Sequence, residues 1–280
     1  MPFIRVRRAL ARASLGAVAL CTYLTAAHAE GPGDLLVAPT RLELNGFRGT
    51  EVILNNIGSE TATYRVSVEL RRMTPDGDLI DVDPAQASDS EKLAEEMIAY
   101  APRRVTLAPN QPQSIRIGVR PPPNLPDGEY RVHLLFRAIP DPKPVTAAQT
   151  PTEGLAIELT PIYGVTIPVI VRAGQLSAQA GIAGAKLTVD NGKPAVAVEL
   201  TRAGNRSLYG DVQLFKPGSA NPVIVVTGVA IYAELDRRSV VLDVPEGFKG
   251  SLAGPATIRY VERTDEGPGK LLAEAQVTLR

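Results

Sequence analysis

The longest alternating pattern of apolar and polar positions lies at residues 155–171. Every odd position of this segment carries an apolar or ring side chain: Leu155, Ile157, Leu159, Pro161, Tyr163, Val165, Ile167, Val169 and Val171. Because successive side chains of a β-strand point to opposite faces, the alternation predicts one strand with an unbroken apolar face. Its 17 residues would reach about 55 Å, whereas a usual strand has about five or six residues.

Two prolines in this segment limit how it can pair. Pro161 and Pro168 have no N–H to donate, which predicts a strand at a sheet edge or one that leaves a sheet. Exposed apolar edges promote aggregation, so a chain that keeps one is expected to pair it with another chain. We assign Leu155, Ile157 and Leu159 to a partner and residues 163–171 to the protein's own core. In the alternative interpretation, all of these residues cover the protein's own core.

The rest of the chain after residue 34 consists of short segments rich in Val, Ile, Leu and Thr, separated by turn signals. This pattern predicts an all-β protein built of sandwiches. The first set of predicted strands is 35–44, 50–55, 63–73, 79–82, 103–107, 113–119, 130–139 and 155–171. The second set is 186–190, 195–202, 210–215, 223–226, 230–235, 239–244, 256–262 and 271–279. Residues 90–100 are expected to form a helical turn or two, or a loop.

The chain begins with an export signal. Arginines at positions 5, 7, 8 and 12 precede an apolar run at 13–24, and Ala27-His28-Ala29 fits a small-x-small cleavage site. Residues 1–29 are therefore expected to be removed, and no later segment is long enough to predict an integral membrane segment. The remainder is expected to divide into one sandwich domain at 30–172 and a second at 173–280.

The cysteine content and the net charge exclude some means of stabilisation and some classes of binding partner. The single cysteine, Cys21, lies in the signal, so the exported chain cannot depend on disulfides. Without the signal, 26 basic residues stand against 30 acidic ones, a net charge near −4. Such a mild charge argues against nucleic acid as the main partner.

The chain carries no pattern typical of an enzyme. His133 is the only histidine outside the signal, and no G-x-S-x-G elbow, P-loop or paired Cys/His spacing accompanies it. We interpret His133 as a structural or surface residue. The acidic residues at 76, 78, 81 and 83 depart from a calcium loop and are interpreted as a hairpin around Pro75-Asp76-Gly77. We therefore predict no catalytic residue, no metal and no cofactor.

One basic residue has two interpretations. Arg41 lies in the first predicted strand, where it is either a solvated side chain paired with a nearby carboxylate or an anchor for a ligand carboxylate. A guanidinium can hold a carboxylate through two parallel hydrogen bonds.

Four stretches resemble the periplasmic chaperones of the chaperone–usher pathway. Thr40-Arg41 is similar to the family's Thr-Arg start, and Leu-Ala-Pro at 107–109 precedes an alternating strand at 114–117. The stretch LPDGEYR at 125–131 leads to FRAIP at 136–140, and the alternating strand from Leu155 comes last. The resemblance covers about residues 34–172 well, whereas the second predicted domain resembles that of the family mainly in size and number of strands.

The resemblance implies two immunoglobulin-like β-sandwich domains in an L-shaped arrangement that bind pilin-like subunits. The chaperone would donate the edge strand at Leu155, Ile157 and Leu159, Arg41 would bind the subunit's terminal carboxylate, and the subunit would pass to an outer-membrane usher. A self-capping dimer is also possible.

The chain departs from the family's pattern at one position. The lysine that joins the arginine in the family falls here on Gly164 or Pro168, and Arg172, Arg131 and Arg137 stay open as replacements. Alternatively, the carboxylate anchor is weaker or the bound subunit differs from those of the family. The alternative function is a two-domain structural or adhesion protein that binds a ligand through loops.

Overall fold

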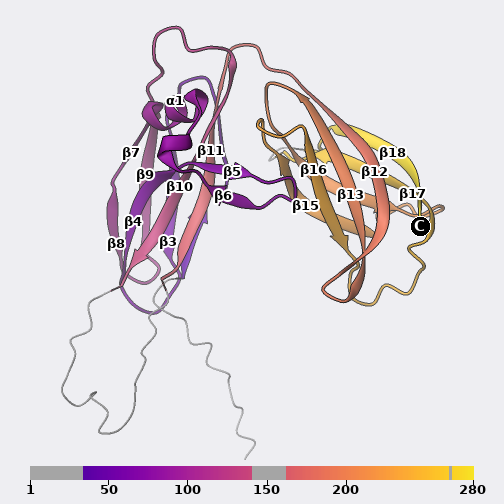
Figure 1. Cartoon of the computed structure of the whole chain (residues 1–280). Coiled ribbons are helices and arrows are strands. Elements are labelled where there is room, and N and C mark those ends of the chain that lie inside the picture. Colours follow the sequence, from indigo (N-terminus) through magenta and orange to yellow (C-terminus); the bar gives the residue numbers. More distant parts are fainter. Residues whose placement is uncertain (1–33, 141–161, 265–266) are drawn as a thin grey trace, which may run out of the picture.

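The computed structural model describes residues 34–140, 162–264 and 267–280 of the 280-residue chain. These residues form two immunoglobulin-like β-sandwich lobes that meet at one end and diverge from there in an L-shaped arrangement (Figure 1). The predicted all-β class is confirmed. Each lobe has its own hydrophobic core, one formed by residues up to 173 and the other by residues after 177. The division after residue 172 stays our proposal for the domain boundary, with Ala173, the last residue of β11, packed in the first core.

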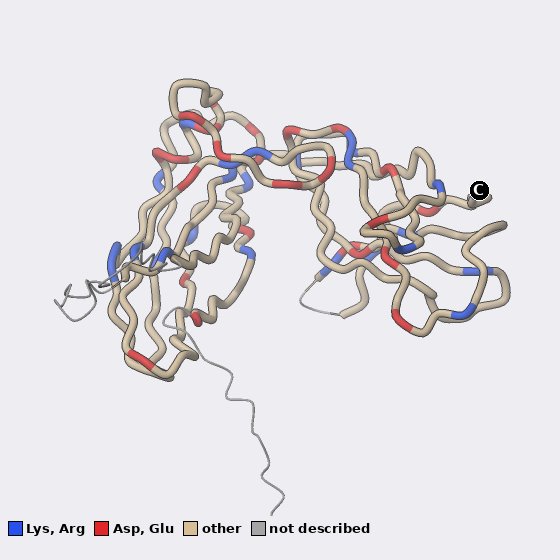
Figure 2. Tube along the Cα trace, turned by 60° about the horizontal axis from the view of Figure 1, so that its bottom comes forward, with Lys and Arg blue, Asp and Glu red and all other residues tan. Residues whose placement is uncertain are grey.

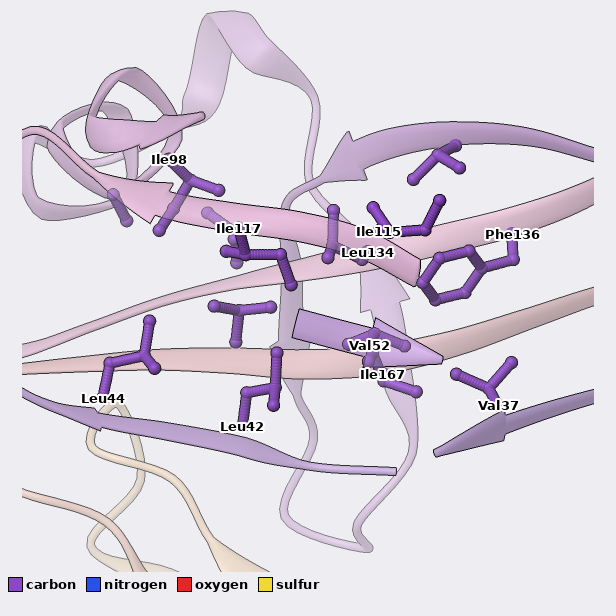
Figure 3. Packing of buried hydrophobic residues seen from close by; sticks show 14 of the residues in the cluster. Val37, Leu42, Leu44, Val52, Ile98, Ile115, Ile117, Leu134, Phe136 and Ile167 are labelled. Atoms are coloured by element: carbon purple, nitrogen blue, oxygen red, sulfur yellow. The ribbon is translucent and has the colours of Figure 1, made fainter. Parts of the chain in front are cut away.

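The first lobe packs a four-stranded sheet against a five-stranded one. The four-stranded sheet has the order β1 (Leu35–Ala38), β3 (Thr50–Asn56), β9 (Pro112–Val119) and β7 (Ile98–Ala101). The five-stranded sheet has the order β2 (Leu42–Asn45), β11 (Gly164–Ala173), β10 (Gly128–Ile139), β4 (Ala62–Glu69) and β8 (Arg104–Leu107). Alternate side chains of these strands meet between the sheets, as Val52, Ile115 and Phe136 do in Figure 3.

The second lobe is also a sandwich. Its three-stranded sheet has the order β12 (Ala178–Asp190), β13 (Lys193–Gly204) and β16 (Arg237–Asp243). Its four-stranded sheet has the order β15 (Ile224–Ile231), β14 (Leu208–Phe215), β17 (Gly254–Glu262) and β18 (Leu271–Leu279). The separate strands predicted at 223–226 and 230–235 are wrong, because β15 runs without a break from 224 to 231 and residues 232–235 lie outside any strand.

Two predicted strands of the first lobe are each divided. The segment 35–44 becomes β1 and β2, which lie in opposite sheets, so the chain crosses the sandwich between Ala38 and Leu42. The segment 63–73 becomes β4 and the short β5 (Arg71–Met73). The apolar pattern of the sequence does not show either break, because the two strands on either side of each break have similar composition and are separated by only a few residues.

The short helix predicted around residue 90 is confirmed, although its end was misplaced. Helix α1 (Asp89–Met97) follows a single 3-10 turn at Pro84–Gln86 and begins at a capping box formed by Ser88 and Glu91. Residues 98–101 then form β7 rather than the end of the helix. Arg72 holds the helix through Glu91, with an N–O distance of 2.6 Å.

The predicted hairpin at Asp76-Gly77 connects the two lobes. Strand β5 pairs with β6 (Leu79–Asp81), and the hairpin reaches across to β16 in Figure 1. Its turn accepts a backbone hydrogen bond of 2.7 Å from Ser239 N–H to the Pro75 carbonyl. Met73 is buried against Ile170 of the first lobe and against Ala230 and Tyr232 of the second lobe. The hairpin therefore restricts the angle between the lobes.

A bidentate ion pair reinforces this contact. Arg131 of β10 donates to both oxygens of Glu234, at 3.0 and 2.6 Å, and its guanidinium lies 3.6 Å from the centre of the Tyr232 ring. The same carboxylate accepts a hydrogen bond of 3.0 Å from Met73 N–H. One glutamate of the second lobe thus holds two elements of the first.

The strand β11 leads into the second lobe through a tight turn. Gly174 has a φ of +72°, and a Cβ there would lie 1.6 Å from an oxygen of Asp127. The other oxygen of Asp127 accepts a hydrogen bond of 2.9 Å from Gln175 N–H. A side chain at position 174 would displace this carboxylate, so the turn requires glycine.

Within the three described ranges, no helix has the length and apolar character needed to cross a membrane.

We predict that Glu234→Gln destabilises the folded protein by about 2 kcal/mol, since it leaves the largely buried Arg131 guanidinium without its charge partner. Urea unfolding monitored by circular dichroism measures this change. The control Glu246→Gln removes an exposed carboxylate of the same lobe and should shift the free energy of unfolding by less than about 0.5 kcal/mol. Equal stability of the two variants would contradict the proposed role of Glu234.

Candidate functional site

Strand β11 has an outer edge that is only half covered. β10 pairs with it along its whole length, from Gly164 to Ala173. On its other side, β2 pairs in parallel with residues 169–172 only. Along residues 164–168, no described strand occupies that side. The predicted sheet edge is therefore confirmed for the first half of β11 and wrong for the second half, which lies inside the sheet.

The backbone alternation decides which groups this uncovered edge offers. Ala138 N–H donates to the Tyr163 carbonyl at 2.9 Å, so odd-numbered residues here direct their backbone polar groups toward β10. Even-numbered residues direct theirs outward. Gly164 and Thr166 therefore present N–H and C=O groups that pair with no backbone group among the described residues, whereas Pro168 presents only a carbonyl. Proline is tolerated at this position because its nitrogen faces the uncovered side.

The side chains of β11 divide as the alternation predicted, with two exceptions. Ile167, Val169 and Val171 are buried in the core of the first lobe. Tyr163 is 56% exposed and precedes the strand, so its assignment to the core was wrong. Ile170 points to the opposite face and is fully buried between the lobes. The candidate partner-binding residues Leu155, Ile157 and Leu159 lie outside the described residues.

A second uncovered edge belongs to the four-stranded sheet. β1 is its outermost strand and pairs with β3 on one side only. Val37 of β1 points into the core near Phe136, as Figure 3 shows, whereas Leu36 is 50% exposed. β1 and β2 are consecutive parts of one chain segment, but only β2 lies beside β11. The first half of β11 is uncovered because β1 pairs in the other sheet.

Arg41 lies at the end of the uncovered edge of β11. It immediately precedes β2, whose first residue, Leu42, is opposite Val169. The Arg41 side chain is only 12% exposed and pairs with Glu43 at 2.7 Å. Its guanidinium lies 4.4 Å from the centre of the Tyr209 ring and 5.8 Å from that of Tyr232. The first interpretation of Arg41 predicted its pairing with a nearby carboxylate correctly. Its prediction of a solvated side chain was wrong, because the second lobe covers Arg41.

Glu43 is shared by two arginines. Its other oxygen lies 2.5 Å from Nη1 of Arg172 on β11. Burial by itself would raise the pKa of Glu43, but the charges of Arg41 and Arg172 outweigh it and lower the pKa below its usual range. Of the three arginines considered as the second cation, Arg172 is thus the one that shares a carboxylate with Arg41. Arg131 is engaged with Glu234, and Arg137 is exposed near the other end of β10.

Glu129 connects Arg172 to the second lobe. The Nε of Arg172 lies 3.2 Å from an oxygen of Glu129, and that oxygen accepts hydrogen bonds from the Ser207 N–H and hydroxyl at 3.1 and 2.9 Å. Figure 2 shows basic and acidic positions together in the part of the chain where the lobes meet. The charges around Arg41 are therefore held by contacts from both lobes.

His133 lies beside this cluster, on the same face of β10 as Arg131. It is 1% exposed, its ring makes an edge contact with Tyr232, and neither ring nitrogen has a hydrogen-bond partner among the described residues. Burial, followed by the charges of Arg131, Arg71 and Arg41, lowers its pKa to about 3. His133 is thus a neutral structural residue of the contact between the lobes, as one of the two sequence interpretations held.

Comparison with known proteins gives similarity of structure only. No protein-family model matches the chain, and no curated protein sequence matches it. Solved structures that match include the Pseudomonas aeruginosa CupB2 chaperone, with 15% identity, a TM-score of 0.48 and coverage of 88% of this chain and 100% of that chain. The E. coli chaperone DraB has 14% identity, a TM-score of 0.45 and coverage of 88% and 97%. A Salmonella enterica complex of the SafA pilin with the SafB chaperone has 16% identity, a TM-score of 0.41 and coverage of 88% and 97%.

We predict that His133 makes the folded protein sensitive to mild acid. Its pKa is lowered in the folded state, so the unfolded chain binds one more proton between about pH 6.5 and 3 and stability falls as the pH is lowered through this window. The slope should approach about 1.4 kcal/mol per pH unit. In His133→Leu the slope should be largely absent.

Urea unfolding between about pH 6.5 and 5 isolates this effect, because the perturbed carboxylates Glu43 and Glu91 titrate at lower pH. The protein should carry no histidine tag. A slope in His133→Leu equal to that of the natural protein would show that the acid sensitivity arises elsewhere.

Proposed function

We propose that this protein is a non-enzymatic periplasmic chaperone that holds pilin-like subunits by β-strand addition and delivers them to an outer-membrane usher. The observation that carries the proposal is the uncovered outer edge of β11 at residues 164–168. This edge directly follows the alternating apolar segment at 155–163 in the sequence. An unpaired edge that adjoins an apolar face is suited to receive a strand from another chain.

The two components of such an interaction are separable. Backbone pairing with Gly164 and Thr166 would hold any extended segment. Burial of Leu155, Ile157 and Leu159 in a groove of the subunit would add about 2 kcal/mol for each side chain. The apolar side chains would therefore supply most of the preference for a subunit with an open hydrophobic groove.

The position of β2 suggests the direction of the added strand. A strand lying along residues 164–168 of β11 cannot continue past Pro168, because β2 occupies the edge from Val169 onward. Arg41 lies at this boundary. A subunit strand that ends there with its carboxylate would run parallel to β11, as β2 does.

Arg41 has the chemistry for this carboxylate. Its buried Nη2 lies 2.7 Å from Glu43 in a geometry that forms no hydrogen bond, so the guanidinium retains donor capacity. Tyr209 and Tyr232 contact the guanidinium and restrict its orientation. In the proposed complex, the terminal carboxylate takes a place beside Glu43 or displaces it toward Arg172. Release would follow exchange of the donated strand for one from the next subunit, with no nucleotide needed.

Ile157→Asp should abolish capture of the subunit while the isolated protein stays folded. The change loses the burial of one apolar side chain and requires a charge to enter the groove, which lowers affinity by more than about 100-fold. Co-purification of the subunit from periplasm measures the effect. Ala156→Asp is the matched control, because the alternation places residue 156 on the other face and capture should persist. Undiminished capture by Ile157→Asp would disprove donation of this strand. Purification of the natural protein without any subunit would also contradict donation and would favour the alternative function as an adhesion protein.

Arg41→Ala should weaken binding of the subunit's C-terminal peptide at least about tenfold, by loss of a charge-assisted hydrogen bond. Titration calorimetry with the free and the amidated peptide tests the carboxylate directly. The natural protein should prefer the free carboxylate, and Arg41→Ala should bind both forms equally. If Arg41→Ala keeps the preference, the carboxylate is anchored by another residue.

A further inference from the structure

Three arginines face one another across neighbouring strands of the five-stranded sheet. Arg137 of β10 is directly opposite Arg65 of β4, and Arg65 is directly opposite Arg104 of β8. We call this row the arginine ladder. Opposed residues in neighbouring strands have Cβ atoms about 5 Å apart, which is shorter than the Debye length of about 8 Å in physiological salt. The three charges therefore repel one another.

The ladder lies on the outer face of the sandwich. The neighbours of Arg65 in sequence, Tyr64 and Val66, are buried in the core, as are Val105 beside Arg104 and Phe136 beside Arg137. Because side chains alternate between faces, all three arginines point away from the core, and all three are exposed.

The described residues supply no negative charge to this row. None of the three arginines forms an ion pair within the described ranges. Strands β4, β8 and β10 carry two acidic residues, Glu69 and Glu129, and these pair with Arg71 and Arg172 nearer the second lobe. Glu69 follows Arg65 by four residues, which corresponds to about 13 Å along the strand.

Like charges placed directly opposite one another destabilise a sheet, so this arrangement lowers stability unless an anion binds it. The row also has a defined neighbour. Arg137 is opposite Gly164, the first residue of β11 and the start of its uncovered edge. A strand added at that edge would become the next member of the same row.

We propose that the arginine ladder is a docking surface for an acidic polypeptide segment of the bound subunit. Charge complementarity and continuity with the uncovered edge of β11 favour this partner over an isolated phosphate or a membrane surface. An extended segment presents alternate carboxylates on one side about 7 Å apart, a spacing that fits a row of arginines spanning about 10 Å. This inference rests on the proposed function for the identity of the segment, but not for the chemistry of the surface.

Binding of a fluorescent deca-glutamate peptide to the full exported protein tests the surface itself. At about 50 mM salt, Arg65→Gln should weaken binding about threefold, and the triple variant with Arg104→Gln and Arg137→Gln should abolish it. Arg116→Gln is the matched control, because Arg116 is an exposed strand arginine on the opposite sheet. It should leave binding unchanged.

Three outcomes would overturn the proposal. The first is deca-glutamate binding that survives in the triple variant or falls equally in Arg116→Gln. The second is absence of peptide binding together with ladder-dependent binding to phosphatidylglycerol vesicles. The third is self-association that depends on the ladder, measured by sedimentation, which would make a second copy the occupant.

Association with the captured subunit separates this proposal from the function on which it rests. The triple variant should slow association about tenfold at low salt and remove its salt dependence, whereas dissociation changes little. An unchanged rate and salt dependence would exclude the ladder from subunit binding even where Ile157→Asp abolishes capture. Failure of the natural protein to capture any subunit would disprove the proposed function. Binding of deca-glutamate would then still test whether the arginine ladder binds acidic polypeptides.

Discussion

Among the strands that the structure describes, β11 has neighbours on both sides along residues 169–172 and on one side along residues 164–168. The cause is the crossing of the first chain segment from one sheet to the other, which places β1 and β2 at different sheet edges. A strand with half of its outer polar groups unpaired is normally a hazard. Here Pro168 removes one N–H from the uncovered edge, β2 covers the edge from Val169 onward, and Arg41 lies where this cover begins. Arg41 and the apolar segment proposed for partner binding adjoin this half-covered strand, and the arginine ladder begins beside it at Arg137.

A partner that contacts both a strand edge and a residue covered by the second lobe needs the two lobes in a fixed relation. Several contacts supply it. They are the hairpin around Pro75, the Arg131–Glu234 pair, and Glu129, which pairs with Arg172 and accepts hydrogen bonds from Ser207 of the second lobe. Most of these charges are partly or fully buried, where breaking one pair leaves another uncompensated. The lobes are therefore held by polar interactions that reinforce one another, together with the apolar cluster around Met73.

The sequence predicted the architecture well, because alternation of apolar residues is the direct consequence of a sandwich core. The strand 271–279, predicted with the bounds that the structure has, is an example. The sequence did not show that the segment 35–44 crosses between sheets, since the strands on both sides of the crossing have the same alternation. It also gave no sign that Arg41 is covered by Tyr209 and Tyr232, because residues 41, 209 and 232 come together only when the lobes meet.

Backbone pairing along a strand edge distinguishes poorly between partners, because every extended chain carries the same N–H and C=O groups. Selectivity must then come from side chains around the edge. In this protein the two ends of the uncovered segment differ chemically. Arg41 at one end is largely buried and paired with Glu43, while the arginine ladder beside Gly164 at the other end is exposed and forms no ion pair with a described residue. A buried cation suits a single carboxylate in a fixed position, whereas exposed cations act at longer range and mainly affect the rate of encounter. On the proposed function, the ladder would attract an acidic subunit first and Arg41 would then fix the register of its terminal strand.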